Sequence, residues 1–270
     1  MSFIDVEQMY GDWPLSDEEV QEILDRSLGP RSSDSLFTTV ASLGVGPEHR
    51  VLDAGARDAR HALTLAGCFG CHVVAVDPVA RHIEEANKAI ANDEHGDLVE
   101  VRQGRLEDLP IDDGSVELVF CRDVLSHISD LATALSECRR VLVPGGHMVI
   151  YQTFATDRME PKEAAFLYPS LAVVPESMDP SRLETEAAQA GLTVASTDVI
   201  GSEWREAWEE DGTRRTADQL LQAARLFRGR DHLLEELGDT MYRVELANAI
   251  WGVYQMIGKL EPRVYVLRKD

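Results

Sequence analysis

Short apolar segments alternate with helical segments between residues 50 and 152, and this alternation limits the fold more than any other feature of the chain. The apolar segments are residues 50–53, 72–76, 98–103, 116–120 and 147–152. Helical periodicity lies between them, most clearly at Leu131, Leu135 and Leu142. Repeated strand–helix units form parallel sheets with helices on both faces. The sequence therefore predicts an α/β fold with a doubly wound, Rossmann-like sheet.

The first strand leads into a turn that suits a nucleotide-like ligand. Gly55 follows the strand, and a helical segment begins near Ala59. The start of a helix presents free backbone N–H groups, and a tight turn lets a ligand approach the backbone. The second strand ends in Asp77, where a carboxylate can accept hydrogen bonds from a ribose diol. We expect the ligand at the carboxyl ends of the strands.

Charge limits the functions that this fold can serve. The chain has 270 residues and a formal net charge of −22 at pH 7, and such a field repels nucleic-acid phosphates and anionic lipids. No apolar run approaches the roughly 18 residues of a membrane span, and no basic and apolar export signal begins the chain. The sequence predicts a cytoplasmic protein with a small-molecule substrate, without nucleic-acid or membrane partners.

The cysteines do not form a metal-binding pattern. Cys68 and Cys71 make a C-x-x-C pair, but no second pair follows at zinc spacing. Cys121 lies in an apolar strand and Cys138 on an apolar helix face. We expect four reduced thiols, mostly buried, and no metal site, as is usual in a cytoplasm.

The chain divides into five segments. The predicted segments are an N-terminal helical cap (1–46), a nucleotide-binding core (47–155), a loop, helix and sixth strand (156–201), a helical insertion or lid (202–260) and a last core strand (261–270). Two capping boxes predict helix starts: Ser16 with Glu19, and Ser181 with Glu184. The N-terminal helices either cover the ligand site or pack on the sheet. The last helix is apolar around much of its surface, so it is buried, lines a cavity or forms a homo-oligomer interface.

Four motifs in order resemble the class I S-adenosylmethionine-dependent methyltransferases that act on small molecules, of the methyltransferase-11 and -25 kind. The motifs are V-L-D-A-G-A-R-D-A-R-H from residue 51, Val76-Asp77, G-R-L-E-D-L-P from residue 104, and F-C-R-D-V-L-S-H from residue 120 with R-R-V-L-V-P-G-G from residue 139. Each motif alone is weak, and the ordered set is specific. The resemblance covers residues 51–154. It implies about seven strands, mostly parallel with the last one antiparallel, and S-adenosylmethionine as cofactor with S-adenosylhomocysteine as product.

The resemblance also implies which residues contact the cofactor, each of them placed after one of the first four strands. Asp53 and Gly55 would bring the turn close to the methionine moiety. Asp77, followed by Pro78, would bind the ribose hydroxyls. The remaining contacts would be Leu106 and Glu107 at the adenine, and the backbone of Cys121 and Arg122 at the methionine amino group.

Two positions depart from the family pattern. Arg57 and Ala59 replace the second and third glycines of the turn, so the turn is expected to avoid a glycine-only backbone conformation at Arg57. The Arg57 guanidinium would reach the cofactor's carboxylate or point to solvent. Arg105 replaces an acidic residue that often contacts adenine in relatives, so Glu107 or backbone groups would take over that contact.

The acceptor site is less constrained by the sequence. His127 follows the fourth strand and is a candidate general base, because histidine titrates near neutral pH; the alternative is that it packs the start of a helix. A cationic amine could be attracted by Glu203, Glu206, Glu209 and Glu210, which otherwise form a solvated helix face. Residues predicted to bind the substrate are Tyr10, Asp123, Tyr168, Trp204 and Trp208.

The sequence thus favours methyl transfer to oxygen, nitrogen or carbon of a small molecule, in natural-product biosynthesis for instance, by in-line displacement. Two alternatives stay open. One is a cofactor-binding protein on the same scaffold with a regulatory or non-methylating role, which the altered turn permits. The other is a nicotinamide-dependent oxidoreductase, which the absence of G-x-G-x-x-G from the first turn disfavours.

Overall fold

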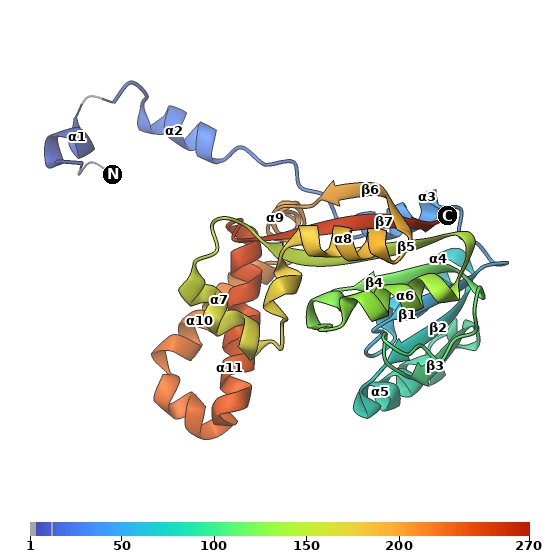
Figure 1. The fold of residues 1–270 in the computed structure, drawn as a ribbon. Helices are drawn as coiled ribbons and strands as arrows, with labels where there is room; N and C mark the ends of the chain where they lie inside the picture. The colour runs from blue at the N-terminus through green and yellow to red at the C-terminus, as the bar shows by residue number, and fades with distance from the viewer. Residues whose placement is uncertain (1–3, 12) are drawn as a thin grey trace.

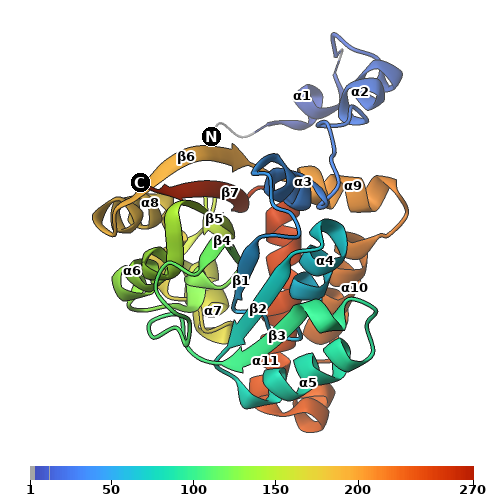
Figure 2. The ribbon, with the colours of Figure 1, turned by 90° about the vertical axis from the view of Figure 1, so that its right-hand side faces the viewer.

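The computed structural model of the chain describes residues 4–11 and 13–270. Its centre is a seven-stranded sheet (Figure 2). The strand order is β3-β2-β1-β4-β5-β7-β6. The strands are β1 (Arg50–Ala54), β2 (His72–Asp77), β3 (Val99–Gln103), β4 (Val116–Arg122), β5 (Leu142–Ala155), β6 (Leu192–Val199) and β7 (Leu260–Lys269). The first five strands are parallel, and β7 runs antiparallel to both β5 and β6. The predicted doubly wound sheet with an antiparallel last strand is confirmed.

Eleven α-helices occur in the described part of the chain (Figure 1). They are α1 (Val6–Tyr10), α2 (Asp17–Leu24), α3 (Ser35–Ser42), α4 (Arg60–Phe69), α5 (Ala80–Ala91), α6 (Leu131–Val141), α7 (Pro161–Ser170), α8 (Pro180–Gln189), α9 (Glu203–Glu210), α10 (Arg215–Arg228) and α11 (Arg230–Met256). Three 3₁₀ helices add single turns at Gly96–Leu98, Leu125–His127 and Pro175–Met178.

Alternation of apolar side chains along the strands builds a core on each face of the sheet. Val51 and Val73 face α3, α4 and α5, whereas their neighbours Leu52 and Val74 face α6 and α8. Successive side chains of a strand point to opposite faces, and a parallel sheet buries both. Burial of a side chain such as Leu135 on α6, which is 0% exposed, contributes about 2 kcal/mol to stability.

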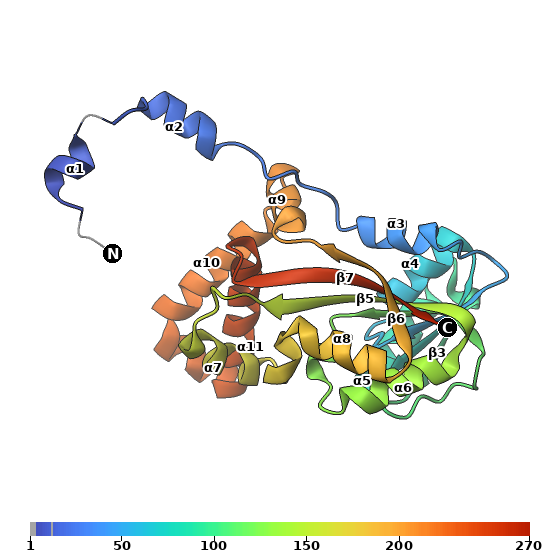
Figure 3. The same ribbon diagram turned by 45° about the horizontal axis from the view of Figure 1, so that its top comes forward.

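The N-terminal helices do not form a cap over the sheet. The predicted capping box is present in α2, where the Ser16 N–H donates to Glu19 Oε2 at 2.8 Å. Even so, α1 and α2 bury no residue, and both lie away from the sheet (Figures 1 and 3). Only α3 of this segment packs on the sheet, through Leu36 and Val40. Residues 1–3 and 12 of the predicted cap lie outside the described residues.

The insertion between β6 and β7 consists of α9, α10 and α11. Helices α10 and α11 pack side by side near α7 (Figure 1), around a small core that includes Leu226, Tyr242 and Leu246. Gly238 breaks the helical geometry inside α11 with a φ of 74°. Contacts within the chain therefore cover much of the apolar surface of α11. Of the three roles that the sequence allowed for this helix (buried core, cavity wall or homo-oligomer interface), these contacts favour the first.

One predicted helix start is wrong. Helix α8 begins with Pro180, and the side chain of Asp179 accepts a hydrogen bond from the Ser181 N–H at 2.9 Å. Proline suits the first helical position because it has no N–H to leave unpaired. The cap of α8 is therefore Asp179, and the predicted box of Ser181 with Glu184 is not formed.

Candidate active site

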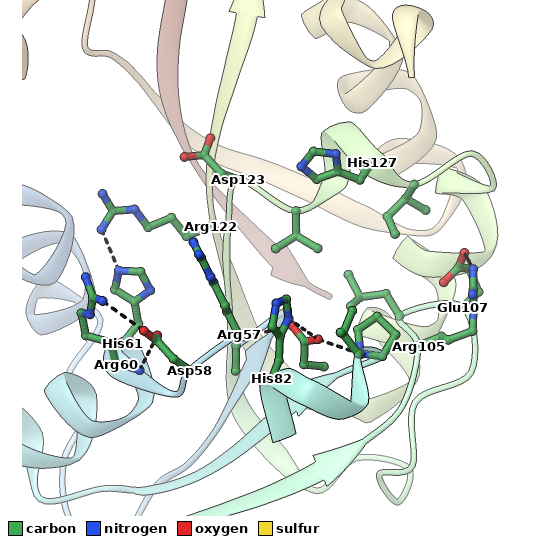
Figure 4. A pocket seen from close by; sticks show the side chains of 18 of the residues that line it. Arg57, Asp58, Arg60, His61, His82, Arg105, Glu107, Arg122, Asp123 and His127 are labelled. Atoms are coloured by element: carbon green, nitrogen blue, oxygen red, sulfur yellow. Dashed lines mark hydrogen bonds and ion pairs between the residues drawn. The ribbon is translucent and has the colours of Figure 1, made fainter. Parts of the chain in front are cut away.

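A cavity of about 840 Å³ opens at the carboxyl ends of β1, β2 and β4. Its wall is made by the turn after β1, the end of β2, the loop after β3, the segment after β4 and parts of α9 and α10 (Figure 4). This is where ligands bind in parallel α/β sheets. The cavity brings together ten of the predicted site residues: Gly55, Arg57, Asp77, Pro78, Leu106, Glu107, Arg122, Asp123, His127 and Trp208.

The other five predicted site residues do not line this cavity. Asp53 and Cys121 are buried within the sheet at 2% and 1% exposure. Tyr168 packs in the core between α7 and α11, and Trp204 stacks on Tyr151 at 4.8 Å between ring centroids. Tyr10 lies on α1 and is 77% exposed. Four of the five are thus buried in the protein, and the fifth lies on α1, which buries none of its residues.

The turn after β1 depends on Gly55. Its φ is 81°, and a Cβ added there would lie 2.3 Å from Val124 Cγ2. The N–H groups of Gly55 and Ala56 both donate to the Val76 carbonyl, at 2.8 and 3.0 Å. Glycine therefore permits both the left-handed backbone and the close approach of the segment after β4.

Arg57 and Ala59 keep the left-handed backbone of the turn. Their φ values are 49° and 60°, a region that favours glycine but that other residues can adopt at some energetic cost. The turn therefore avoids a conformation open only to glycine at Arg57, as the sequence predicts, although it stays in the left-handed region. The Arg57 side chain extends into the cavity (Figure 4).

Asp77 joins the turn after β1 to the start of α5. Its Oδ2 accepts a hydrogen bond from the Arg57 N–H at 3.0 Å, and its Oδ1 accepts one from the Val79 N–H at 2.9 Å. His82 Nδ1 lies 3.0 Å from the same Oδ1. The carboxylate is therefore fixed at the cavity wall. His82 was not among the predicted site residues. Its position five residues after Asp77, at the start of a helix, could have indicated this contact.

Asp53 lies beneath this wall as a buried carboxyl group. Desolvation raises the pKa of Asp53 to about 7, and the negative charge of Asp77 adds to the effect. Its Oδ2 has no hydrogen-bond partner among the described residues. Because burial disfavours the charged form, the Asp53 carboxyl group of the folded protein loses its proton only near neutral pH.

Asp53→Asn is expected to make the unfolding free energy less sensitive to pH. The folded-state pKa of Asp53 lies above that of an unfolded aspartate, so the wild-type protein loses stability as pH rises from about 4 to about 7. Between pH 5 and pH 8 this loss amounts to about 2–3 kcal/mol. Urea titrations at both pH values would measure it, with the exposed Asp97→Asn as control. Equal pH dependence in Asp53→Asn and wild type would contradict the assignment.

Arg122 is held in place by its neighbours. Burial lowers the pKa of His61 to about 4, with help from the positive charges of Arg122 and Arg60. The neutral imidazole therefore accepts, through Nε2, a hydrogen bond from Arg122 Nη1 at 2.9 Å. The Arg122 guanidinium also lies 5.2 Å from the ring centroid of Tyr151. The sequence did not predict His61, which reaches the site from α4 (Figure 4).

His127 has one ring nitrogen free for chemistry. Its Nδ1 lies 3.0 Å from the Ala172 carbonyl, which can only accept, so Nδ1 carries the proton and Nε2 has a free lone pair. Asp123 lies nearby with a φ of 55°. Burial raises the pKa of Asp123 to about 6, although Arg122 and His127 act in the opposite direction. The site thus offers an imidazole nitrogen with a free lone pair and a carboxyl group with a raised pKa.

In residues 4–11 and 13–270, no group of three or more His, Cys, Asp or Glu side chains is arranged to hold a metal ion. None of the described helices combines the length and the apolar character needed to cross a membrane.

Comparison with known proteins connects the cavity to a family. Residues 52–150 match the family described as "Methyltransferase domain". Glycine/sarcosine/dimethylglycine N-methyltransferase of Actinopolyspora halophila is 32% identical over 120 residues, which are 44% of this chain and 21% of that protein. The chain thus spans about a fifth of the length of this curated relative.

Two solved structures show the same fold. The geranyl diphosphate C-methyltransferase of Streptomyces coelicolor A3(2), solved with Mg²⁺, geranyl diphosphate and S-adenosylhomocysteine, has a TM-score of 0.66 at 16% identity and covers 88% of this chain and 77% of its own. The [4+2]-cyclase SpnF has a TM-score of 0.68 at 16% identity and covers 88% of this chain and 81% of its own. The fold is therefore found with different named activities.

Proposed function

Because this chain carries the domain of the S-adenosylmethionine-dependent methyltransferases, we propose that it transfers a methyl group from this cofactor to oxygen, nitrogen or carbon of a small molecule. The observation that supports this most is the cavity in which the Gly55 turn and the Asp77 carboxylate meet. The proposal includes a cytoplasmic location and a role in natural-product chemistry. Four free cysteines are compatible with a reducing compartment.

The residues of the cavity fit S-adenosylmethionine. The cofactor supplies an activated methyl group on its sulfonium sulfur. The turn at Gly55 leaves room for the methionine part, and the fixed carboxylate of Asp77 can accept hydrogen bonds from the ribose hydroxyls. Leu106 and Glu107 line the wall beside Asp77, where they would border the adenine. A cavity of about 840 Å³ has room for the cofactor and a small acceptor together.

Two measurements test the proposal as a whole. Calorimetry with S-adenosylhomocysteine should give a dissociation constant in the micromolar range. Formation of S-adenosylhomocysteine should then follow when the chain is incubated with S-adenosylmethionine and a panel of small-molecule acceptors. Tight cofactor binding without methyl transfer to any acceptor would count against an enzyme of this class.

Arg57→Gly should weaken cofactor binding about tenfold without loss of folding. We propose that the Arg57 guanidinium binds the cofactor's carboxylate, because it extends into the cavity and has no acidic partner among the described side chains. Loss of one hydrogen bond to a charged group corresponds to about 1.5 kcal/mol. Glycine adopts a φ of 49° without strain, so the urea unfolding curve should shift little. Unchanged affinity in calorimetry would place the arginine outside the cofactor site.

We propose His127 as the general base wherever the acceptor must lose a proton. The hydrogen bond from Nδ1 to the Ala172 carbonyl leaves Nε2 to accept that proton. His127→Gln should lower kcat by about 100-fold with an acceptor that ionises, and leave cofactor affinity unchanged. The control is His95→Gln, a partly buried histidine outside the cavity. If His127→Gln and His95→Gln had the same kcat, His127 would not be the general base.

The N-terminal segment is proposed to close over the cavity. Its helices expose Val6, Met9 and Leu24, each more than 50% exposed, and apolar surface of this kind marks a contact site. Arg31, between this segment and the sheet, donates to Asp198 Oδ2 at 2.7 Å, and Ser33 lines the cavity. Limited proteolysis should cut residues 13–30 more slowly when S-adenosylhomocysteine and an acceptor are bound. An equal cutting rate would leave the segment without this role.

A second candidate is a cofactor-binding protein that catalyses another reaction on the same scaffold. The likeness to a [4+2]-cyclase supports it, as do the arginine and alanine in the turn. Under this alternative the chain converts its substrate without producing S-adenosylhomocysteine. Mass spectrometry of substrate and cofactor in one reaction would separate the two functions.

A further inference from the structure

The cavity wall has more positive charge than its own carboxylates neutralise. Five arginines and four acidic residues line it. Two of the acids are already paired with arginines of the wall, Asp58 with Arg60 at 3.0 Å and Glu107 with Arg105 at 3.1 Å. Asp77 and Asp123 are left to oppose Arg57, Arg122 and Arg215, none of which makes an ion pair among the described residues. This excess stands out in a chain with a net charge of −22.

Arg122 has aromatic and histidine neighbours where an acidic partner would usually be found. Its guanidinium lies 5.2 Å from the ring centroid of Tyr151 and 5.9 Å from that of Trp204. One Nη1–H is used by the neutral His61. Stacking on aromatic rings fixes the plane of a guanidinium and leaves its edge free for other hydrogen bonds. Arg122 is therefore oriented in advance, and part of its donor edge is unused.

Two arginines pack against Trp208 of the cavity wall: Arg215, which also lines the cavity, and Arg205, which is buried behind it. The guanidinium carbons of Arg215 and Arg205 lie 4.7 and 5.2 Å from the Trp208 ring centroid. Arg205 is 8% exposed and donates to amide oxygens of Gln255 and Gln219. Burial and the nearby charge of Arg215 lower the pKa of Arg205 to about 10, which leaves it protonated at neutral pH. The Arg215 side chain makes no hydrogen bond among the described residues, so its donors remain available.

We propose that the acceptor carries an anionic group, a carboxylate or a phosphate, and that Arg122 and Arg215 bind it. Guanidinium groups match the geometry of both anions. Bound S-adenosylmethionine adds a positive sulfonium, so it does not neutralise the excess. A cleft lined by one sign of charge concentrates ligands of the opposite sign. This inference rests on the proposed function, because it names the class of acceptor for the same cavity.

The acidic residues of α9 do not favour a cationic acceptor instead. Glu203 binds Arg31, Glu206 accepts from the Leu28 N–H at 2.8 Å, and Glu209 accepts from the Thr216 N–H at 2.6 Å. These carboxylates are absent from the cavity wall. They serve to join α9 to the N-terminal segment and to α10.

Titration of the full chain with simple ions tests this inference. Inorganic pyrophosphate and citrate represent phosphates and carboxylates, and tetramethylammonium represents cations. Calorimetry at constant ionic strength, with and without saturating S-adenosylhomocysteine, should show binding of at least one anion and no binding of the cation. Arg122→Gln and Arg215→Gln should each weaken the anion at least tenfold, and Arg215→Lys should recover part of the loss. The matched control is Arg228→Gln, an exposed arginine at the far end of α10.

The outcomes separate this inference from the proposed function. It is overturned if neither anion binds, if tetramethylammonium binds as well as the anions, or if an Arg122→Gln/Arg215→Gln double variant with a wild-type thermal unfolding curve keeps full anion affinity. Failure of S-adenosylhomocysteine to bind would instead oppose the proposed function, and the titrations without it would still decide for or against an anionic ligand. Wild-type cofactor affinity in Arg215→Gln would place Arg215 on the acceptor side of the cavity.

Discussion

Gly55→Ala should lower the unfolding free energy by about 3 kcal/mol and weaken binding of S-adenosylhomocysteine by about 100-fold or more. A left-handed φ of 81° costs alanine about 1 kcal/mol. The added Cβ would also lie 2.3 Å from Val124 Cγ2, and the overlap adds about 2 kcal/mol. Relief of that overlap moves the turn or the segment after β4, and both form the cavity wall. Urea unfolding and calorimetry would measure the two effects.

Gly145→Ala is the matched control for this substitution. Its φ is 77°, and an added Cβ would meet nothing within 4 Å. It should cost about 1 kcal/mol through backbone strain alone and leave cofactor affinity unchanged. Wild-type affinity in Gly55→Ala would mean that the turn does not hold the cofactor.

The parts of the fold and site that follow from local sequence were predictable. Each of the first strands is short and apolar, and its length and alternation are visible without tertiary information. Gly55, Asp77 and Leu106 lie at or shortly after the ends of strands, so a parallel sheet brings them to one edge whatever the rest of the chain does. The bounds were less accurate, since β5 extends over Leu142–Ala155 where the sequence indicated residues 147–152.

The acceptor side could not be predicted in the same way, because it depends on where distant segments pack. Arg215 reaches the cavity from a helix that lies outside the core, and no local pattern connects it to Arg122. Aromatic residues were also ambiguous, because the same side chain serves equally well in a core or in a pocket. Trp208 lines the cavity, whereas Trp204, four residues earlier on the same helix, stacks in the core. Helix periodicity alone does not distinguish them.

Asp77→Ala should weaken cofactor binding by more than about 100-fold, close to 3 kcal/mol. The substitution removes the proposed acceptor for the ribose hydroxyls, and each hydrogen bond to a carboxylate contributes about 1.5–3 kcal/mol. It also leaves the Arg57 N–H without its partner and frees the start of α5, where Val79 and His82 bind the same carboxylate. Calorimetry with S-adenosylhomocysteine would measure the affinity, and urea unfolding the accompanying loss of stability.

Asp58→Ala distinguishes a specific loss from a general loss of negative charge at the site. Asp58 lines the same cavity, but it binds Arg60, whose side chain is 78% exposed, and exposed ion pairs contribute little. We therefore expect the affinity of Asp58→Ala for S-adenosylhomocysteine to stay within about threefold of wild type. The cofactor affinity of Asp77→Asn should lie between those of Asp58→Ala and Asp77→Ala, because the amide keeps one oxygen that can accept from a ribose hydroxyl. Equal losses in Asp58→Ala and Asp77→Ala would show that charge alone, and not the position of the carboxylate at the end of β2, attracts the cofactor.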